Sequence, residues 1–473
     1  MPDRLSSQDV SFLYLESPET AMHVGSVMIF EPGEDGFDVE RLTRHVGARI
    51  AFVPRYRQRV RTVPGRIANP VWVDDGRFDL NYHVRRSALP TPGSDEQLED
   101  LVARLQSRPL DRRRPLWELV VVEGLRNGRI AVVTKVHQAL VDGVRTVDLG
   151  QVILDDTPDA PEPPSDTWRP PAEPGTLELL AGAVNDSVRR PRQALDTVRS
   201  GLADVRDTSA RAARSLGGIA RIARTAAGAP ASSPFNQQAG EHRRFMMIAT
   251  DLDDYRKVRS SLSRDDAALT ITVNDVVLAT LTGALRAWLL QRGDPVPPGS
   301  HIRTVVPVSV RLPEQETTPT AIGSRVQSLL VDLPTGEPSP AIRVHQVAYQ
   351  TKAHRDAGQA IDAPALMAMT GFAPPTLHSL GARVASGLSR RLYHLVVTNV
   401  PGPQHPLYLD GARMTASYPV VPLARGQVLS VGLTSYDGSV YYGLNADRDA
   451  MTDLDVVGQC IHDALAELVE AVR

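Results

Sequence analysis

The segment Lys135–Val144, with the sequence KVHQALVDGV, holds the residues whose types and spacing are best suited to chemistry. It follows an apolar run, and Asp142 and Gly143 within it are a turn signal. A histidine beside a carboxylate at a strand end suits general acid–base catalysis. The same residues also fit a polar strand terminus with a tight turn. On its own, the segment leaves a catalytic and a structural interpretation open.

Other familiar site motifs are absent from the sequence. It has no G-x-G-x-x-G, no P-loop, no H-E-x-x-H and no G-x-S-x-G. The twelve histidines are scattered without metal-ligand spacing, so no metal site is predicted. The single cysteine, Cys460, excludes an intrachain disulfide, and we expect it to be a buried apolar filler in a terminal helix.

The first part of the chain alternates sequence signals for helices and strands, and we expect these elements to position the segment Lys135–Val144. Asn127-Gly128 between two apolar runs is a strong hairpin signal. The predicted elements are a strand over His23–Phe30, helices over Val39–Phe52 and Gln97–Gln106, and strands over Trp117–Glu123 and Arg129–His137. The hairpin therefore ends at His137, the first residue of chemical interest.

A proline-rich stretch, Asp155–Gly175, reads as an extended linker. After it, Leu177–Thr225 has apolar residues at helical spacing and a face rich in arginine. Such a helix either packs its apolar stripe on the protein or lies on an anionic membrane surface. Both interpretations are open.

The remainder of the chain again mixes helices and strands. The predicted elements are helices over Thr272–Arg286 and Thr452–Val472, strands over Ile302–Val310, Arg325–Leu333 and Tyr393–Val400, and a hairpin over Val428–Leu444. The fold class is therefore α/β with two lobes of similar size. We place the lobes at residues 1–155 and 235–473, with the linker and helical crossover at 156–234.

Length and charge limit the classes of function that the chain can have. The chain has 473 residues, 42% of them apolar and 23% charged, with a net charge of −3. A dedicated nucleic-acid binder would be basic, so that class of partner is disfavoured. The first residues lack the apolar core of a signal peptide, and no run of about 18 apolar residues exists. We expect a cytoplasmic protein, either free or peripheral at the inner membrane or at lipid inclusions.

Four further blocks decide between the interpretations of Lys135–Val144. Met22–Gly25 and Pro115–Trp117 precede the segment, and Asn274-Asp275 and Thr398–Pro403 follow it. In this order the blocks resemble the wax ester synthase/diacylglycerol acyltransferase family over almost the whole chain. His137–Gly143 is similar to the HHxxxDG motif of that family. Each block is weak alone, whereas their joint order is highly specific.

The resemblance implies two lobes of the chloramphenicol-acetyltransferase type with a tunnel between them. Acyl-CoA enters from one side and a lipid hydroxyl acceptor from the other, and no dissociable cofactor or metal is implied. The second histidine of the motif is the general base, the aspartate (here Asp142) holds the loop, and Gly143 permits the turn. The resemblance also assigns substrate-binding or structural importance to Pro115, Leu116, Trp117, Asn274 and Asp275.

The sequence departs from the family pattern at the catalytic position. It reads His137-Gln138, so His137 occupies the first histidine position and Gln138 the second. An amide does not accept a proton usefully at neutral pH. A regular strand through residue 138 would turn Gln138 toward the tunnel and His137 away from it. His137 would then replace the missing base only through a bulge or a shifted register.

We therefore expect an acyl-CoA-dependent O-acyltransferase that makes triacylglycerol or wax ester, weakened by Gln138. Two alternatives stay open: an acyl-CoA or lipid binder without turnover, and an acyltransferase for another hydroxyl acceptor. Individual residues also keep a structural interpretation. Trp117 and His23 fit a core role, and Asn274-Asp275 fits the cap of an apolar helix.

Overall fold

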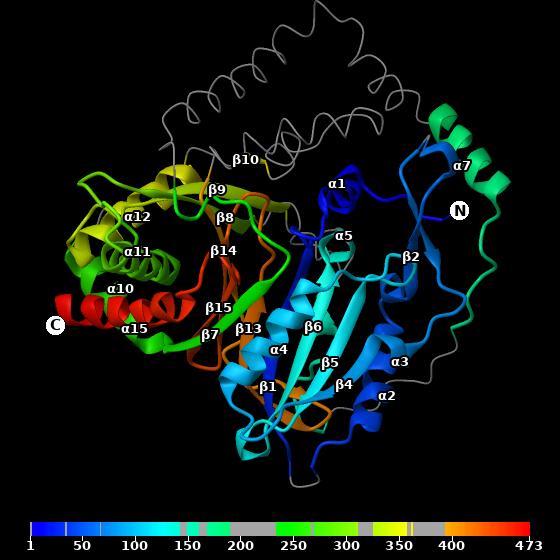
Figure 1. The fold of residues 1–473 in the computed structure, drawn as a ribbon, viewed down its shortest axis with the longest axis horizontal. Coiled ribbons are helices and arrows are strands. Elements are labelled where there is room, and N and C mark those ends of the chain that lie inside the picture. The colour runs from blue at the N-terminus through cyan, green and yellow to red at the C-terminus, as the bar shows by residue number, and fades with distance from the viewer. Residues whose placement is uncertain are drawn as a thin grey trace, which may run out of the picture.

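The structure is a computed structural model. It describes residues 2–33, 36–66, 68–141, 149–159, 168–189, 233–265, 269–310, 325–356, 361–362 and 393–473. Asp142 and Gly143 lie outside the described residues, as does the arginine-rich stretch after Arg189. Two large sheets, each with its own helices, form the two halves of the molecule (Figure 1).

The first sheet carries the predicted hairpin. Its order is β12 (Tyr408–Leu409), β13 (Ala412–Val420), β1 (His23–Glu31), β6 (Ile130–His137), β5 (Trp117–Glu123) and β4 (Val84–Ala88). β5 and β6 are antiparallel neighbours, which confirms the hairpin. Asn127 and Gly128 between them have φ of 63° and 70°, the left-handed values that favour this residue pair in a hairpin turn. All eight residues of β6 are buried.

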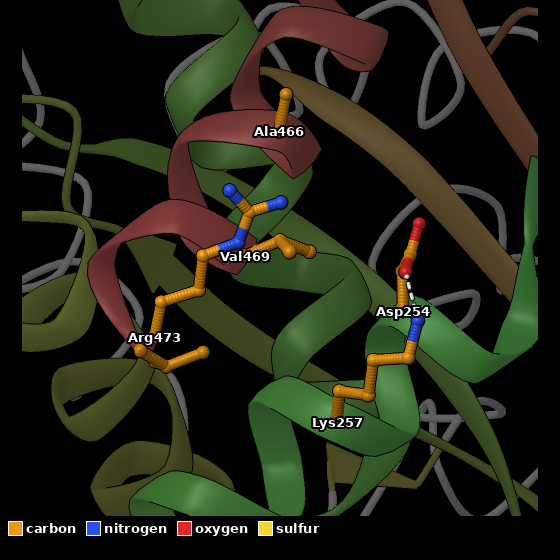
Figure 2. A pocket seen from close by; sticks show the side chains of 6 residues that line it. Asp254, Lys257, Ala466, Val469 and Arg473 are labelled. Atoms are coloured by element: carbon orange, nitrogen blue, oxygen red, sulfur yellow. Dashed lines mark hydrogen bonds and ion pairs between the residues drawn. The ribbon is translucent and has the colours of Figure 1, made fainter.

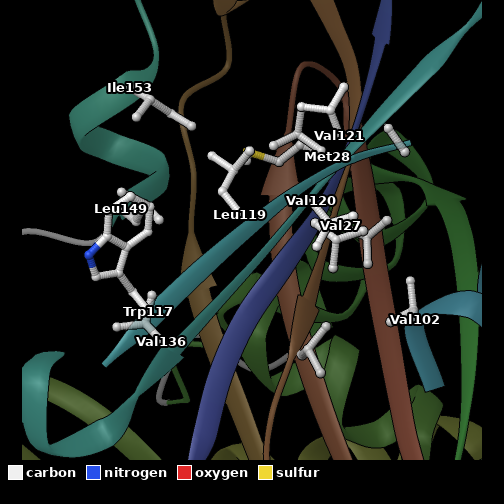
Figure 3. Packing of buried hydrophobic residues seen from close by; sticks show 14 of the residues in the cluster. Val27, Met28, Val102, Trp117, Leu119, Val120, Val121, Val136, Leu149 and Ile153 are labelled. Atoms are coloured by element: carbon white, nitrogen blue, oxygen red, sulfur yellow. The ribbon is translucent and has the colours of Figure 1, made fainter. Parts of the chain in front are cut away.

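Six α-helices accompany the first sheet in the described part of the chain. They are α1 (Ser7–Leu15), α2 (Val39–Ile50), α3 (Leu80–His83), α4 (Asp95–Ser107), α5 (Gln138–Val141) and α6 (Leu149–Ile153). The two longest of them, α2 and α4, each bury an apolar stripe. In α2, Leu42, Val46 and Ile50 are fully buried, as the helical spacing predicts. In α4, Ser94 and Gln97 form a capping box that fixes its start. Figure 3 shows side chains of this core, including Val102 of α4.

The first sheet includes two strands from the far end of the sequence. β13 pairs antiparallel with β1, with Gly25 opposite Val420, and β12 pairs with β13. The sequence placed residues 408–420 in the 235–473 lobe, whereas strand pairing places β12 and β13 in the sheet of the first lobe. The physical reason is the open edge of β1, whose backbone N–H and C=O groups β13 satisfies.

The second sheet belongs entirely to the second half of the chain. Its order is β10 (Ile361–Asp362), β9 (Arg325–Leu333), β8 (Ile302–Val310), β11 (Leu395–Pro401), β14 (Leu429–Tyr436), β15 (Ser439–Asp447) and β7 (Arg243–Asp251). β8 and β9 have the predicted bounds. The β14–β15 hairpin is also confirmed, with Asp437 and Gly438 at positive φ at its tip.

Four helices pack together on the second sheet. They are α10 (Leu252–Asp265), α11 (Val273–Gln291), α12 (Pro340–Asp356) and α15 (Leu454–Ala471). α11 is long and apolar enough to cross a membrane, but 72% of its apolar window is buried inside the protein. It is therefore the core helix of this lobe. Cys460 of α15 is 1% exposed, which confirms its expected role as a buried filler.

The described end of the linker docks on a small two-stranded sheet, β2 (Gln58–Arg61) and β3 (Val71–Asp74). Glu173 forms ion pairs with Arg59 and Arg61. The helix α7 (Thr176–Arg189) then buries Leu179 against Val71 and Val73 of β3, whereas Leu177 stays 81% exposed.

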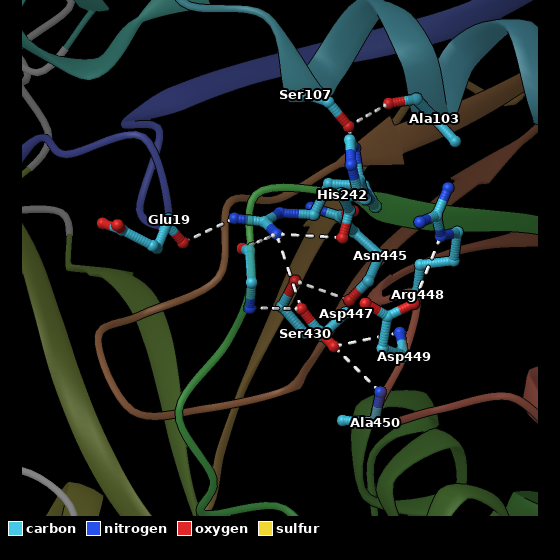
Figure 4. A network of polar contacts seen from close by, with 12 residues as sticks. Glu19, Ala103, Ser107, His242, Ser430, Asn445, Asp447, Arg448, Asp449 and Ala450 are labelled. Carbon is cyan, nitrogen blue, oxygen red and sulfur yellow. Dashed lines mark hydrogen bonds and ion pairs between the residues drawn. The ribbon is translucent and has the colours of Figure 1, made fainter.

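A buried arginine joins the two halves. Arg243 of β7 donates from Nη2 to the carbonyl of Glu19 at 2.6 Å, and its backbone N–H donates to Ser107 Oγ of α4 at 3.0 Å (Figure 4). Its guanidinium also lies 3.9 Å from Asp447. The N-terminal lobe and the edge strand of the second sheet are thus held by specific polar contacts.

Candidate functional site

His137 is the last residue of β6 and is completely buried. It lies opposite His23 of β1, and the β1–β6 pairing runs without a bulge from His23–His137 to Phe30–Ile130. Its Nδ1 accepts the backbone N–H of Ala139 at 3.0 Å. Because that lone pair is used, the ring carries its proton on Nε2, on the side of Glu16.

Glu16 is the centre of the buried polar cluster behind the motif. It follows α1, and its Oε1 lies 3.1 Å from His23 Nε2 and 3.7 Å from His137 Nε2. Its Oε2 accepts from Arg112, at 2.9 Å from Nε. Burial alone would raise the pKa of the Glu16 carboxyl, but the two histidines and Arg112 hold it far below its usual range.

The other titratable groups around the motif have structural roles. Burial lowers the pKa of His23 to about 4, so this ring is neutral at pH 7. Lys135 donates from Nζ to the carbonyls of Leu105 and Arg108 at the end of α4. Burial lowers its pKa to about 8, yet its ammonium is committed to these carbonyls. Neither group is placed to accept a proton from a substrate.

These contacts decide the role of His137 within the motif. The histidine has no free lone pair and is 0% exposed, so it holds the strand end and cannot act as the missing base. A regular strand through Gln138 was expected to turn His137 away from the tunnel, and the ring is buried beside Glu16. The strand, however, ends at His137, because Gln138 begins α5.

Gln138 is the half-buried residue of this pair. Its backbone N–H donates to Met22 O at 2.8 Å, while Ala139 and Leu140 are buried beneath it. Among the described residues, no hydrogen bond to the Gln138 side chain is formed. Its side chain is half-buried at the start of α5. Such an amide donates and accepts hydrogen bonds but does not take up a proton.

The Pro115-Leu116-Trp117 block lies beside the motif and is buried. Leu116 O accepts the N–H of His137 at 3.0 Å. Trp117 is 0% exposed, donates from Nε1 to Tyr56 O at 2.7 Å and stacks on His83 at a ring-centroid distance of 4.6 Å. Trp117 is thus a core residue, and this block supports the motif strand from within.

The Asn274-Asp275 block starts α11. Asp275 Oδ2 accepts from the N–H and hydroxyl of Thr272 at 2.8 and 2.7 Å, which confirms the capping interpretation. Asp275 Oδ1 also accepts from Thr351 of α12 at 2.7 Å. Asn274 Oδ1 accepts from Asn399 Nδ2 of β11 at 2.7 Å, so two of the sequence blocks meet here.

Sequence reasoning missed Glu16 and Arg112 as partners of the motif. Both fall in or near noted blocks, and a charged residue seven positions before His23 was the available signal. Nothing in the sequence indicates that His23, Glu16 and His137 meet, because strand pairing brings them together.

Other parts of the described chain offer weaker sites. A surface hollow between α10 and α15 is lined by Asp254, Lys257 and Arg473 among others, with an ion pair of 2.9 Å between Lys257 and Asp254 (Figure 2). Its lining residues include no serine, cysteine or histidine, and it belongs to the second lobe, away from α5. Within the described residues, no cluster of metal-binding side chains is found.

The comparisons with known proteins match this arrangement. The wax ester synthase/diacylglycerol acyltransferase catalytic domain matches residues 5–277, and the C-terminal domain of that family matches residues 322–469. The chain belongs to the wax ester synthase/diacylglycerol acyltransferase family.

Two relatives from Mycobacterium tuberculosis carry the name "Probable diacyglycerol O-acyltransferase". One is 47% identical over 266 residues, which cover 56% of this chain and 98% of the relative. The other is 34% identical over 484 residues, which cover 99% of both chains.

Solved structures show the fold. The wax ester synthase/diacylglycerol acyltransferase of Marinobacter aquaeolei is 27% identical, with a TM-score of 0.66 and 99% of each chain covered. The first condensation domain of the CDA synthetase, 14% identical, has a TM-score of 0.55 and covers 100% of this chain and 97% of its own. The two lobes are therefore of the chloramphenicol-acetyltransferase type that the sequence predicted.

Proposed function

We propose that the protein is an acyl-CoA-dependent O-acyltransferase that forms triacylglycerol or wax ester. The acceptor is a lipid hydroxyl, either of diacylglycerol or of a fatty alcohol. Family membership over nearly the whole chain supports the reaction class, as do the names of the mycobacterial relatives. The observation that carries the proposal is the intact support of the motif strand, with His137 held by Glu16 and Ala139.

The chemistry forms one bond and breaks another. The acceptor oxygen attacks the thioester carbonyl, the C–S bond breaks, and the acceptor proton ends on the thiolate to give free CoA. In this chain Gln138 accepts a hydrogen bond from the hydroxyl and orients it, but does not remove its proton. Loss of a general base costs about 10²–10⁴ in rate, so we expect a slow enzyme.

The test is CoA release by the purified protein with palmitoyl-CoA and dioleoylglycerol, compared with Gln138→His. We expect slow release by the natural protein and an increase of about 10²-fold or more in the variant. His137→Gln is the matched control, and it should not gain activity because that ring faces Glu16. Equal rates for the natural protein and Gln138→His would place the base elsewhere.

Gln138 also favours a second candidate function, an acyl-CoA or lipid binder without turnover. In that case the natural protein binds a nonhydrolysable acyl-CoA ether by calorimetry but releases no CoA from any thioester and acceptor tried. Activity of Gln138→His would then show a competent scaffold. Transfer to another hydroxyl acceptor would instead appear as a new ester in product mass spectrometry with cell extract.

We propose further that the protein works at a lipid surface, through α7. Leu177 is 81% exposed on this helix although neighbouring Leu179 is buried. Insertion of such a side chain into an acyl boundary is favourable, and the sequence that follows α7 is rich in arginine, a residue that attracts anionic lipid. Vesicles with phosphatidylglycerol should bind the protein more strongly than neutral vesicles, and Leu177→Glu should weaken binding. Leu290→Glu, which changes an exposed leucine of α11, should not. Equal effects of both variants would refute the assignment.

A further inference from the structure

Five arginines gather where the first sheet receives the loop before β5. They are Arg85, at the start of β4, and Arg108, Arg112, Arg113 and Arg114 of the loop. We call them the arginine cluster. Three carboxylates form ion pairs with arginines of the cluster: Glu118 with Arg85, Glu16 with Arg112 and Asp111 with Arg113. Among the described residues, no carboxylate pairs with Arg108 or Arg114. The cluster therefore carries an excess of positive charge.

The ring of Tyr82 contacts two arginines of the cluster. The Arg114 guanidinium carbon lies 3.8 Å from the centroid of the Tyr82 ring, and that of Arg85 lies 4.7 Å from it. Arg85 is also fixed by a 2.9 Å hydrogen bond from Nε to Tyr82 O. The ring thus holds two like charges close together by cation–π contacts. Such preordered guanidiniums suit an anion with several oxygens, since each binds phosphate in a forked geometry.

Strand register places the cluster relative to Gln138. Val84, the first residue of β4, pairs with Leu119 of β5, and Leu119 pairs with Thr134 of β6. Val84 is therefore two strands away from β6, at the level of a residue three positions before His137. With strands about 4.8 Å apart and a rise of about 3.3 Å per residue, the separation is about 14 Å. The loop is also tied to the motif directly, because Arg112 binds the Glu16 carboxylate that faces His137.

We propose that the arginine cluster binds the phosphate groups of the CoA moiety of the acyl donor, with Arg114 as the central contact. In acyl-CoA a pantetheine arm separates the thioester from the phosphates, and the separation between the start of β4 and His137 given by the strand register is of that order. Arg114 holds a partly exposed guanidinium against the Tyr82 ring and forms no ion pair among the described residues, where the charge of Asp111 reaches it only from a longer distance, so a phosphate would supply a direct counter-charge. The inference rests on the proposed use of acyl-CoA.

The test compares two thioesters that differ only in their phosphates. Octanoyl-CoA and S-octanoyl-pantetheine are titrated calorimetrically into the full chain. The natural protein should prefer octanoyl-CoA, and the preference should shrink as salt is raised. Arg114→Gln should weaken octanoyl-CoA binding about 10-fold and leave S-octanoyl-pantetheine unchanged, because a hydrogen-bonded charge is lost only for the first ligand. Arg114→Lys should recover part of the loss.

Arg126→Gln is the matched control, since it removes an exposed arginine at the turn on the opposite end of the sheet. It should bind both thioesters as the natural protein does. Three results would overturn the assignment: no preference for octanoyl-CoA, an equal loss of both ligands in Arg114→Gln, or an equal effect of Arg126→Gln. If the natural protein binds neither thioester, the proposed function itself fails.

Discussion

At the scale of single residues, the two positions of the His-Gln pair have separate tasks. His137 Nδ1 accepts the backbone N–H of Ala139, and its Nε2 faces the Glu16 carboxylate, so the ring fixes the end of β6. Gln138 follows at the first position of α5 with an amide free of hydrogen bonds within the described chain. The protein therefore keeps the structural half of the family motif and alters the half that removes a proton.

We expect Glu16→Gln to destabilise the protein. The carboxylate side chain is 7% exposed and accepts from Arg112, and the buried histidines lie within 4 Å of it. Loss of hydrogen bonds to a charged group costs about 1.5–3 kcal/mol. Denaturant unfolding should show a decrease of that size in the free energy of unfolding. Glu31→Gln, on the exposed end of β1, should change it by less than about 0.5 kcal/mol.

The same substitution separates the two views of this cluster. If Glu16 only fills space, Glu16→Gln preserves stability, and the expected loss is absent. If it orients His137, the loss occurs, and Gln138→His gains less activity in the Glu16→Gln background than in the natural one. A full gain of activity in both backgrounds would contradict the positioning role.

At the scale of elements, local patterns predicted the regular parts well. β8 and β9 have the expected bounds because apolar and β-branched residues predominate in them, and the hairpins follow from Asn127-Gly128 and Asp437-Gly438. No strand was predicted over Ala412–Val420. Its residues alternate between buried apolar and more exposed side chains, so the local signal of a half-buried strand was present in the sequence. Its pairing with β1, in the sheet of the first lobe, is what no local pattern reveals.

Local sequence patterns also predicted only part of the candidate site. The spacing of His137 to Asp142 and the capping role of Asp275 could be read from neighbouring residues. The contact between Asn274 and Asn399 and the joining of Glu16 to His137 could not, since each depends on strands and helices far apart in sequence. Periodicity describes one element at a time, whereas the site is assembled between elements.

At the scale of the whole molecule, the two halves are interlocked rather than merely linked. β13 leaves the second half to complete the first sheet, and its alternate residues join the first core. Arg243 and α4 add polar contacts between the first lobe and β7. Any relative movement of the lobes must therefore bend the chain around β13 and exchange these buried contacts.

One of these contacts should make stability depend on pH. Glu99 of α4 accepts the N–H of Met247 in β7 at 2.7 Å. Burial raises its pKa to about 7, with the neighbouring acids Glu96, Asp95 and Asp100 adding to the effect and the Met247 N–H opposing it. In the unfolded chain the pKa of this carboxyl is near its ordinary value of 4.5. The folded protein keeps the proton between these values, so it loses stability as pH rises from about 4.5 to 7.

Glu99→Gln should remove that loss, because the amide still accepts the Met247 N–H and carries no charge at any pH. Relative to the natural protein, the variant should gain stability between pH 5 and pH 8, by up to about 3 kcal/mol at 1.36 kcal/mol per pKa unit. Thermal unfolding across this range measures the difference. Glu96→Gln, an exposed neighbour on the same helix, should show no comparable gain. A pH profile identical in the natural protein and Glu99→Gln would mean that Glu99 is ionised in the folded state, and that the lobe interface holds a charge instead of a proton.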